Sequence, residues 1–472
     1  MIFSSLTFLC AFLPVTALLY LLSRNRVWRN GVLLAASLVF YAWGEPRFIL
    51  LLLLAAAEGY LGGLLIEKQR SRAVLAVTVT LLVGNLAVFK YLGFFCANLS
   101  PLIPALGRVP ALALPIGISF YTFQILSYVI DLYRGKVSVQ RNFLSLLLYV
   151  SFFPQLIAGP IVRYETVEKE IRDRSESLAD AAVGLRRFIR GLAKKVLLAN
   201  TVALLPDTIY AGDPTVFGTL SYWLAALGYT LQIYFDFSGY SDMAIGLGML
   251  FGFRFPENFD YPYVSLSISE FWRRWHITLN RWFVDYLYIP LGGSRQGTRI
   301  TVRNRLIVFL ATGLWHGAGW TYILWGLWHG LLISLETLFP ALAPRGKKPR
   351  FPLLRGALTF VLVLIGFVMF RAAGVGQGLR IIGSLFSFAA PDAAALAAVQ
   401  PLLSPARLFF LALGILFAFP VLPKAKALLA ARLGEGSAAL ELLGDALALV
   451  GLVLAVLAMA GGAYTPFIYQ QF

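Results

Sequence analysis

The chain has 472 residues, of which 59% are hydrophobic and only 13% are charged. Soluble globular proteins carry about 25% charged residues, so a soluble fold is excluded and lipid is the expected solvent for most of the surface. Lys and Arg outnumber Asp and Glu by 40 to 23, and basic loops beside anionic lipid explain this excess better than nucleic-acid binding does. The two cysteines, Cys10 and Cys96, lie in separate apolar stretches, which argues against a disulfide framework, a zinc site or a thiol nucleophile.

Apolar runs long enough to cross a bilayer recur along most of the chain. A membrane-spanning helix needs about 20 mostly apolar residues, and the predicted spans are 2–22, 31–44, 47–66, 73–97, 111–132, 143–161, 217–235, 302–320, 321–340, 353–371, 406–422 and 440–462. Charges or glycines interrupt three further apolar segments, 183–205, 238–253 and 266–290, which favours amphipathic, re-entrant or protein-buried helices. The sequence therefore predicts an all-α, polytopic membrane protein with about 11 to 13 passes.

The basic residues between the first spans alternate along the chain. Clusters follow the first, third and fifth spans, at Arg24, Arg26 and Arg29, at Lys68, Arg70 and Arg72, and at Arg134, Lys136 and Arg141. Because cytoplasmic loops are enriched in Lys and Arg, this pattern places the N-terminus outside the cytoplasm. Segment 143–161 leads straight into another basic stretch, so its Pro154, Gly159 and Pro160 predict a broken segment that enters and leaves on one side.

No internal repeat of useful length is visible, and we expect 1–472 to form a single integral membrane domain. An approximate boundary near residue 341 separates a motif-rich part, 1–340, from additional spans in 353–472. The chain has no Walker-type phosphate loop, no Gly-x-Ser-x-Gly elbow and no His-Glu-x-x-His metal pair, so these common catalytic motifs are excluded.

All three histidines fall within residues 276–329. His316 follows the apolar run 306–311 and stands among Gly313, Gly317 and Gly319, which allow other backbone to approach closely or the helix to break. Imidazole both takes and gives protons near neutral pH, and ionisable groups at membrane depth indicate function by default. The alternative for His316 is a hydrogen bond between helices. His329 follows 13 residues later and would face away from His316 on a continuous helix, so a structural role is expected.

The first histidine, His276, stands in a different setting. Trp272, His276 and Asn280 recur at four-residue intervals, so they are predicted on one face of a helix whose other side carries Arg273. One interpretation is an interfacial helix whose arginines reach lipid phosphates. The other is a funnel whose arginines attract an anionic, phosphorylated donor. The two interpretations are compatible with each other.

Two carboxylates, Asp236 and Asp242, lie inside apolar sequence and need partners or water. Arginines of 273–281 or a histidine N–H are the expected partners. A structural or histidine-orienting role is favoured over direct acid–base chemistry, because nothing else in the sequence indicates the water-filled cleft that paired catalytic carboxylates need.

Several motifs together resemble the membrane-bound O-acyltransferase family, and within it the bacterial branch of alginate O-acetylase membrane subunits. They occupy residues 117–124, 153–161, 236–242, 256–263, 270–280, 288–293, 314–320 and 466–472. The resemblance covers nearly the whole chain. It implies a helical ring around a thin central region, with funnels from both faces meeting near a histidine.

The resemblance also implies an activity. The family's essential histidine matches His316 and its second polar position matches His276, with Trp272, Arg273, Asn280, Asp236, Asp242 and Trp315 expected to bind or orient substrate. An acyl group, acetyl by expectation, would pass from acetyl-CoA or another acyl thioester, without a bound cofactor or metal, across a bacterial inner membrane. A periplasmic acetyltransferase partner would complete its transfer to a polysaccharide. From the residues alone, a transporter or a non-catalytic scaffold of a glycan-export complex stays open.

Overall fold

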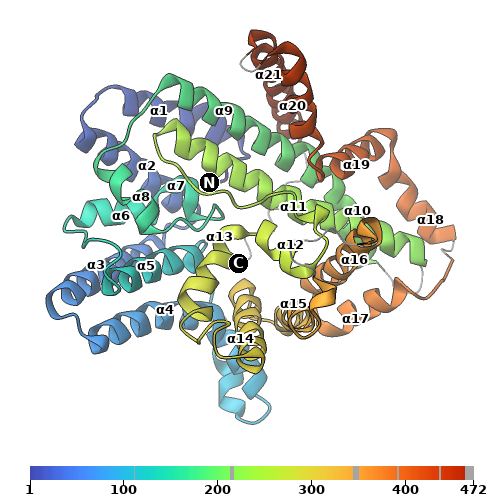
Figure 1. The fold of residues 1–472 in the computed structure, drawn as a ribbon, viewed down its shortest axis with the longest axis horizontal. Helices are drawn as coiled ribbons and strands as arrows, with labels where there is room; N and C mark the ends of the chain where they lie inside the picture. Colours follow the sequence, from blue (N-terminus) through green and yellow to red (C-terminus); the bar gives the residue numbers. More distant parts are fainter. Residues whose placement is uncertain (111, 213–216, 344–349, 391–392, 435–436, 463–472) are drawn as a thin grey trace. The chain divides into compact units, whose positions relative to one another are not determined.

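The computed structural model describes residues 1–110, 112–212, 217–343, 350–390, 393–434 and 437–462, and every regular element in these ranges is helical (Figure 1). The prediction of an all-α fold is confirmed. The described residues group into two compact units, one formed by 1–188 with 240–256 and the other by 189–239 with 257–462. The expectation of a single domain stays a prediction. The motif at 466–472 lies outside the described residues.

The first unit begins with a π-helical turn, Phe8–Phe12, that runs into α1. Its helices are α1 (Leu13–Leu21), α2 (Arg26–Gly44), α3 (Ile49–Gln69), α4 (Arg72–Leu99), α5 (Ile118–Tyr133), α6 (Phe143–Ser151), α7 (Phe153–Leu156) and α8 (Tyr164–Arg172). Helices α3, α4 and α5 pack against one another, and α6 packs on α2 and α3. Asn25 caps α2 and Ser71 caps α4, each by accepting a hydrogen bond from a backbone N–H of the first turn.

Two helices belong to both units: α9 (Leu178–Ala193) and α11 (Thr219–Leu250). The remaining helices of the second unit are α10 (Asn200–Ala211), α12 (Ile268–Arg274), α13 (Ile277–Phe283), α14 (Thr298–His316), α15 (Trp320–Leu338), α16 (Pro352–Arg371), α17 (Val375–Ser384), α18 (Ala393–Val399), α19 (Pro405–Phe417), α20 (Val421–Leu433) and α21 (Ala438–Ala460). A π-helical segment, Lys194–Ala199, joins α9 to α10.

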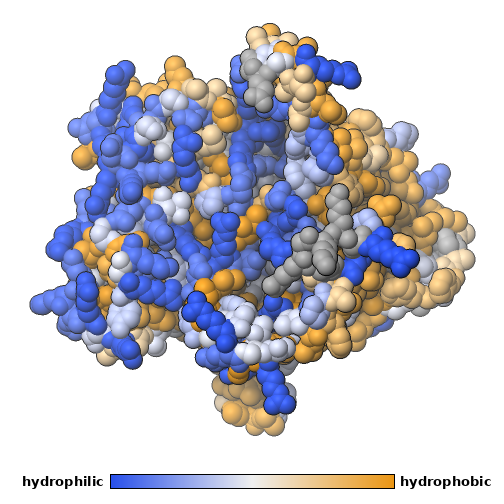
Figure 2. All heavy atoms as spheres, viewed as in Figure 1, coloured by the Kyte–Doolittle hydropathy of each residue, from blue (hydrophilic) through white to orange (hydrophobic). Residues whose placement is uncertain are grey.

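Within the described ranges, α3, α4, α16 and α21 are long and apolar enough to cross a membrane, and a bent pair formed by Ala393–Leu403 and Pro405–Phe417 adds a fifth if it makes one span. Figure 2 shows hydrophobic side chains facing outward over α17, α18 and α19, where Leu379, Leu396 and Phe409 are exposed. An exposed apolar surface marks a membrane or protein interface, and its combination with apolar helices of spanning length indicates the membrane. The chain is therefore a membrane protein, while the number of passes beyond these helices stays a prediction.

One predicted boundary is wrong. Residues 217–235 and 238–253 were expected to form a span and a separate interrupted segment, but they are one continuous 32-residue helix, α11. Its glycines are packing positions rather than breaks. A Cβ on Gly246 would lie 2.4 Å from the carbonyl oxygen of Gly184, and one on Gly239 would lie 2.7 Å from that of Gly191. Both partners belong to α9, which passes α11 at backbone contact.

The expected break in 143–161 is present. Helix α6 ends at Ser151, Phe152 leaves the helical region with φ −54° and ψ 111°, and α7 starts with Pro154 in its first turn. At about 1.5 Å per residue, the nine residues of α6 are too short to cross a hydrocarbon core of about 30 Å. A segment that enters and leaves on one side therefore stays consistent with the structure and remains a prediction.

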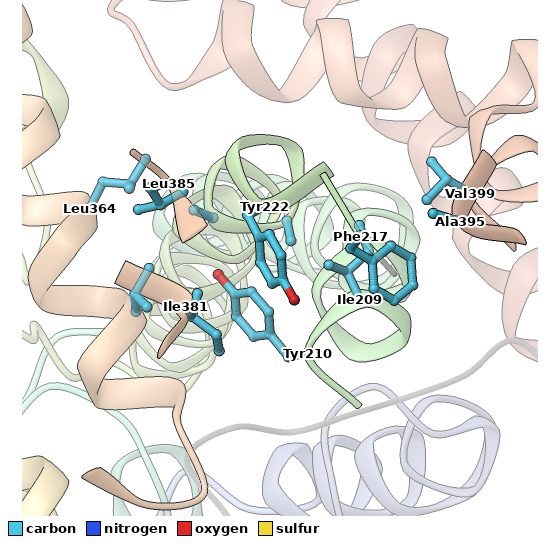
Figure 3. Packing of buried hydrophobic residues seen from close by; sticks show 12 residues of the cluster. Ile209, Tyr210, Phe217, Tyr222, Leu364, Ile381, Leu385, Ala395 and Val399 are labelled. Atoms are coloured by element: carbon cyan, nitrogen blue, oxygen red, sulfur yellow. The ribbon is translucent and has the colours of Figure 1, made fainter. Parts of the chain in front are cut away.

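A buried apolar cluster joins five helices of the second unit (Figure 3). Tyr210 of α10 and Tyr222 of α11 lie side by side in its middle, with Ile381 of α17 on one side and Val399 of α18 on the other. These side chains are almost fully buried. They fix α10 and α11 against α16–α18. The histidine-bearing helix α15 packs in turn on α16, and α14 packs on α15.

Candidate active site

His316 is the last residue of α14, and the turn Gly317–Gly319 leads directly into α15. The two helices pack along each other as a hairpin. A Cβ on Gly313 would lie 2.4 Å from the carbonyl oxygen of Tyr322, and one on Gly317 would lie 2.2 Å from the Tyr322 ring. The expectation that these glycines admit close backbone contact and a helix break beside His316 is confirmed.

His276 lies at a break between two short helices. The expected single helical face through Trp272, His276 and Asn280 is wrong, because α12 ends at Arg274 and α13 begins at Ile277. His276 itself has φ +43° and ψ +53°, in the left-handed region, which costs a non-glycine residue about 1–2 kcal/mol. Such strain persists only where surrounding contacts hold it, and it concentrates at functional sites.

Asn258 holds the break from outside the two helices. Its side-chain oxygen accepts hydrogen bonds from the backbone N–H of Thr278 at 3.2 Å and from the Thr278 hydroxyl at 2.9 Å. The backbone carbonyl oxygen of Asn258 accepts from the N–H of Ile277 at 3.0 Å. The same side-chain oxygen lies 3.2 Å from Nδ1 of His276. One asparagine thus fixes the start of α13 and the imidazole ring together.

These contacts determine the tautomer of His276. A backbone N–H can only donate, so the Asn258 atom that faces Thr278 must be the amide oxygen. Nδ1 of His276 faces the same oxygen and therefore carries the proton. In the neutral ring, Nε2 is then left with a lone pair, and it has no hydrogen-bond partner among the residues that the structure describes.

The rings of His276 and His316 lie 6.4 Å apart, centroid to centroid. His276 is 0% exposed and His316 is 2% exposed. Aromatic rings surround His316 at short range: Trp315 at 5.0 Å, Trp325 at 5.0 Å and Phe370 at 5.3 Å. Two buried imidazoles therefore lie close together in the second unit, in a predominantly aromatic setting.

The third histidine has a structural contact, as expected. Nε1 of Trp272 donates to Nδ1 of His329 at 3.3 Å. A Cβ on Gly366 would lie 2.9 Å from Nε2 of His329, so α16 packs directly on this ring. Trp272, expected beside a substrate, is in this structure 5% exposed and bonded to His329.

The other expected site residues fall into three groups. Asn280 donates from its amide to the carbonyl oxygen of Trp272 at 2.7 Å, which ties α13 to α12. Arg273 is exposed. The carboxylates pair with basic residues other than the arginines of 273–281: Asp236 with Lys195, both almost fully buried, and Asp242 with Arg187 at 2.9 Å.

Sequence reasoning did not single out Asn258, Trp325 or Phe370 as neighbours of the histidines. Asn258 belongs to the motif at 256–263, so the motif could have indicated that it matters. Its role could not be predicted, because it depends on a contact with His276, 18 residues further along the chain. Trp325 and Phe370 stand in apolar sequence like many other aromatic residues. In the described ranges, no group of three or more His, Cys, Asp or Glu side chains is placed to hold a metal ion.

Comparison with known proteins finds O-acetylating relatives over most of the chain. A protein named "Probable alginate O-acetylase" from Pseudomonas aeruginosa is 47% identical over 401 residues, covering 82% of this chain and 75% of that protein. One of the same name from Pseudomonas putida is 41% identical over 496 aligned residues that cover all of both chains. A "Peptidoglycan O-acetyltransferase" from Helicobacter pylori is 35% identical over 417 residues, covering 81% and 79%.

The family match falls on the part of the chain that carries the histidines. The MBOAT, membrane-bound O-acyltransferase family matches residues 134–375, and His276, His316 and His329 all lie in this range. An all-helical fold with several apolar helices of spanning length agrees with it. The chain is an O-acyltransferase and belongs to the membrane-bound O-acyltransferase family.

Proposed function

We propose that this chain passes an acetyl group from a cytoplasmic thioester, acetyl-CoA, towards a hydroxyl of an extracytoplasmic polysaccharide, with His316 as the general base. The relatives support this acceptor class, because their names specify alginate and peptidoglycan, which are both glycans. In this proposal the chain lies in a bacterial inner membrane with its N-terminus in the periplasm. A periplasmic acetyltransferase partner completes the transfer to the glycan.

The reaction needs a proton acceptor and a proton donor at one place. The hydroxyl oxygen attacks the carbonyl carbon of the thioester while its proton passes to a ring nitrogen of neutral His316. The carbon–sulfur bond then breaks, and the imidazolium returns the proton to the departing thiolate. One alcohol and one thioester become one ester and one thiol, and His316 ends in its starting form.

His276 is suited to orient the acceptor. Its Nε2 offers a lone pair, because Asn258 keeps the proton on Nδ1. A hydroxyl carries a single proton, so the hydroxyl that His316 deprotonates cannot also donate to His276, and Nε2 instead accepts a hydrogen bond from a second hydroxyl of the acceptor. With the two rings 6.4 Å apart, and hydrogen bonds of about 2.7–3.0 Å, two neighbouring hydroxyls can contact the two imidazoles. His276 thus positions the acceptor, and His316 removes the proton of the attacking hydroxyl.

The remaining residues act on this pair through position and charge. Trp315 packs on both histidine rings, at 6.0 Å from His276 and 5.0 Å from His316. The Asn280 amide spans the break at which His276 lies by donating to the carbonyl oxygen of Trp272, whose ring is bonded to His329. Arg273, which is exposed, attracts the phosphates of the donor. Asp236 and Asp242 take structural roles as partners of Lys195 and Arg187.

Substrate must displace part of this aromatic cover, because both imidazoles are almost fully buried. The same cover excludes water from a thioester that water would otherwise hydrolyse. The observation that carries the proposal is the approach of two buried imidazoles, one of them with a free lone pair, in the part of the chain that the family match covers.

Purified chain in lipid nanodiscs, given labelled acetyl-CoA, tests the proposal. His316→Ala is expected to lower acetyl transfer at least about 100-fold, since general-base catalysis contributes about 10²–10⁴-fold. His329→Asn is the matched control: it alters another buried histidine of the same cluster, but its amide oxygen can still accept the hydrogen bond from Trp272. It should retain most of the activity.

Near-normal transfer by His316→Ala, at normal yield and thermal stability, would refute the assignment of the base. Mass analysis of the cell-envelope glycans with and without His316 identifies the acceptor. Unchanged glycan acetylation alongside lost activity on acetyl-CoA would contradict the polysaccharide as the destination.

A further inference from the structure

A pocket of about 720 Å³ opens within the first unit, which does not contain the histidines. It lies where α3 and α5 end and where the loop 134–142 leads into α6. Its lining combines three arginines, Arg70, Arg141 and Arg172, and one carboxylate, Glu67, with polar and apolar side chains of the loop 134–142. Figure 2 shows mostly hydrophilic side chains over α3, α5, α6 and α8 on the face in view.

Basic charge predominates in the lining. Three arginines face one carboxylate, and that carboxylate, Glu67, is already paired with Arg141 at 2.9 Å. Arg172 pairs with Glu168 at 3.8 Å and also contacts the hydroxyls of Ser138, at 3.4 Å, and Tyr164. Arg70 has no ion pair among the described residues. The Arg70 guanidinium is thus available to a ligand, and the Arg172 side chain, 56% exposed, presents the rest of its donors beside it.

The side chain of Arg70 is not needed to cap α3. It ends α3 in the left-handed conformation, with φ +45°, and its backbone N–H donates to the carbonyl oxygen of Ile66 at 2.8 Å. The backbone of Arg70 therefore caps the helix, and its guanidinium takes no part in the cap. Guanidinium is the side-chain group best matched to phosphate, because its planar fork donates two parallel hydrogen bonds.

The position of the pocket indicates the kind of phosphate. Helix α3 has the length and apolarity of a membrane span, and α4 begins three residues later as another. The turn between them, with Arg70, therefore lies where a span meets the head-group layer. The apolar part of the lining, Leu132, Val137 and Val139, suits the glycerol region of a lipid as well as it suits a nucleotide.

We propose that the pocket formed by the ends of α3 and α5, the loop 134–142 and Arg172 of α8 is a phosphate-binding site, with Arg70 and Arg172 as its principal ligands. The shared chemistry is a phosphate ester of an anionic phospholipid head group or of a soluble phosphorylated molecule. The site is independent of the choice of catalytic histidine.

The full chain in nanodiscs distinguishes the two sources. In the lipid arm, nanodiscs of phosphatidylcholine with a minor fraction of phosphatidylglycerol are analysed by native mass spectrometry for retained lipid. In the soluble arm, binding of coenzyme A is measured in nanodiscs of phosphatidylcholine alone. The double variant Arg70→Gln with Arg172→Gln is expected to weaken one of these ligands by about fivefold or more per arginine.

Arg72→Gln is the matched control, because Arg72 is exposed, lies two residues from Arg70 and does not line the pocket. A loss confined to the lipid arm assigns the site to a head group, and a loss in the coenzyme A arm assigns it to a soluble phosphate. Equal losses for Arg72→Gln and the pocket variant, or no loss in either arm, overturn the proposal. If the double variant unfolds, Arg70→Gln alone serves, because it breaks no ion pair.

Discussion

A single asparagine sets the state of the candidate site. Asn258 accepts from His276 and twice from Thr278, and it thereby fixes a strained backbone, a ring orientation and a tautomer together. Asn258 is 1% exposed, and its side-chain oxygen faces three donors. This arrangement is maintained because an unmade hydrogen bond to a buried group costs about 1–3 kcal/mol. The catalytic lone pair of the proposal is a consequence of this arrangement.

Asn258→Ala should lower kcat about tenfold or more while KM changes little, because the tautomer of His276 is no longer imposed and a lost buried hydrogen bond is equivalent to about that factor. Acetyl transfer kinetics on purified protein provide the measurement. Thr278→Val, which removes one hydroxyl donor but keeps the backbone bond to Asn258, is the milder control. Equal kcat values for wild type and Asn258→Ala would contradict the positioning role.

At the scale of elements, glycines allow α14, which ends at His316, to pack closely against α15. Gly326 of α15 lies against α14, where a Cβ would come within 2.3 Å of the carbonyl oxygen of Phe309. Gly319, in the turn, has extended backbone, and a Cβ there would meet nothing closer than 3.4 Å. The two glycines therefore have opposite tolerance for a methyl group, although both belong to the same motif-rich hairpin.

Gly326→Ala is expected to destabilise the protein by about 1–3 kcal/mol, the usual cost of overpacking, because a backbone atom cannot yield as a flexible side chain can. Gly319→Ala should leave stability within about 0.5 kcal/mol of wild type. Thermal unfolding in detergent, followed by size-exclusion chromatography, ranks the pair. Similar midpoints for both variants would contradict the close approach of α14 and α15.

At the scale of the whole molecule, polar contacts join parts of the first unit that are far apart in sequence. Glu176, in the segment between α8 and α9, accepts from the Tyr20 hydroxyl at 2.6 Å and pairs with Arg26 at 2.5 Å and Arg29 at 2.7 Å. Arg174 contacts the same carboxylate at 3.3 Å. The connection between α1 and α2 is thus held by a residue about 150 positions later.

This network makes stability depend on pH in a defined direction. Burial alone raises the pKa of Glu176, but the hydrogen bonds from Tyr20 and Arg26 and the charges of Arg26 and Arg29 outweigh it, so the pKa lies below its ordinary value of 4.5. The folded chain therefore binds this proton less tightly than the unfolded chain does. The stabilisation is complete above the unfolded pKa and is lost as the pH falls through the folded pKa.

Glu176→Gln should accordingly lower the unfolding temperature at neutral pH and lose less further stability on acidification below about pH 4.5 than wild type does. The comparison is between the two unfolding curves, because other carboxylates titrate equally in both proteins. Partial exposure of Glu176 and screening by salt keep the effect modest. Parallel pH dependences of wild type and variant would show that Glu176 contributes nothing.

The amino-acid sequence by itself determined that this is an all-helical membrane protein, because apolar runs and missing charges are local properties that lipid imposes on every span. It also picked out His276 and His316, since ionisable groups are rare in such a chain. Only the tertiary structure decided that Thr219–Leu250 forms one helix, and that Lys195 and Arg187 neutralise Asp236 and Asp242. It likewise showed that Asn258 breaks the helical run at His276. Those outcomes depend on contacts between residues that are distant in sequence, and local propensity does not specify which distant residue makes each contact.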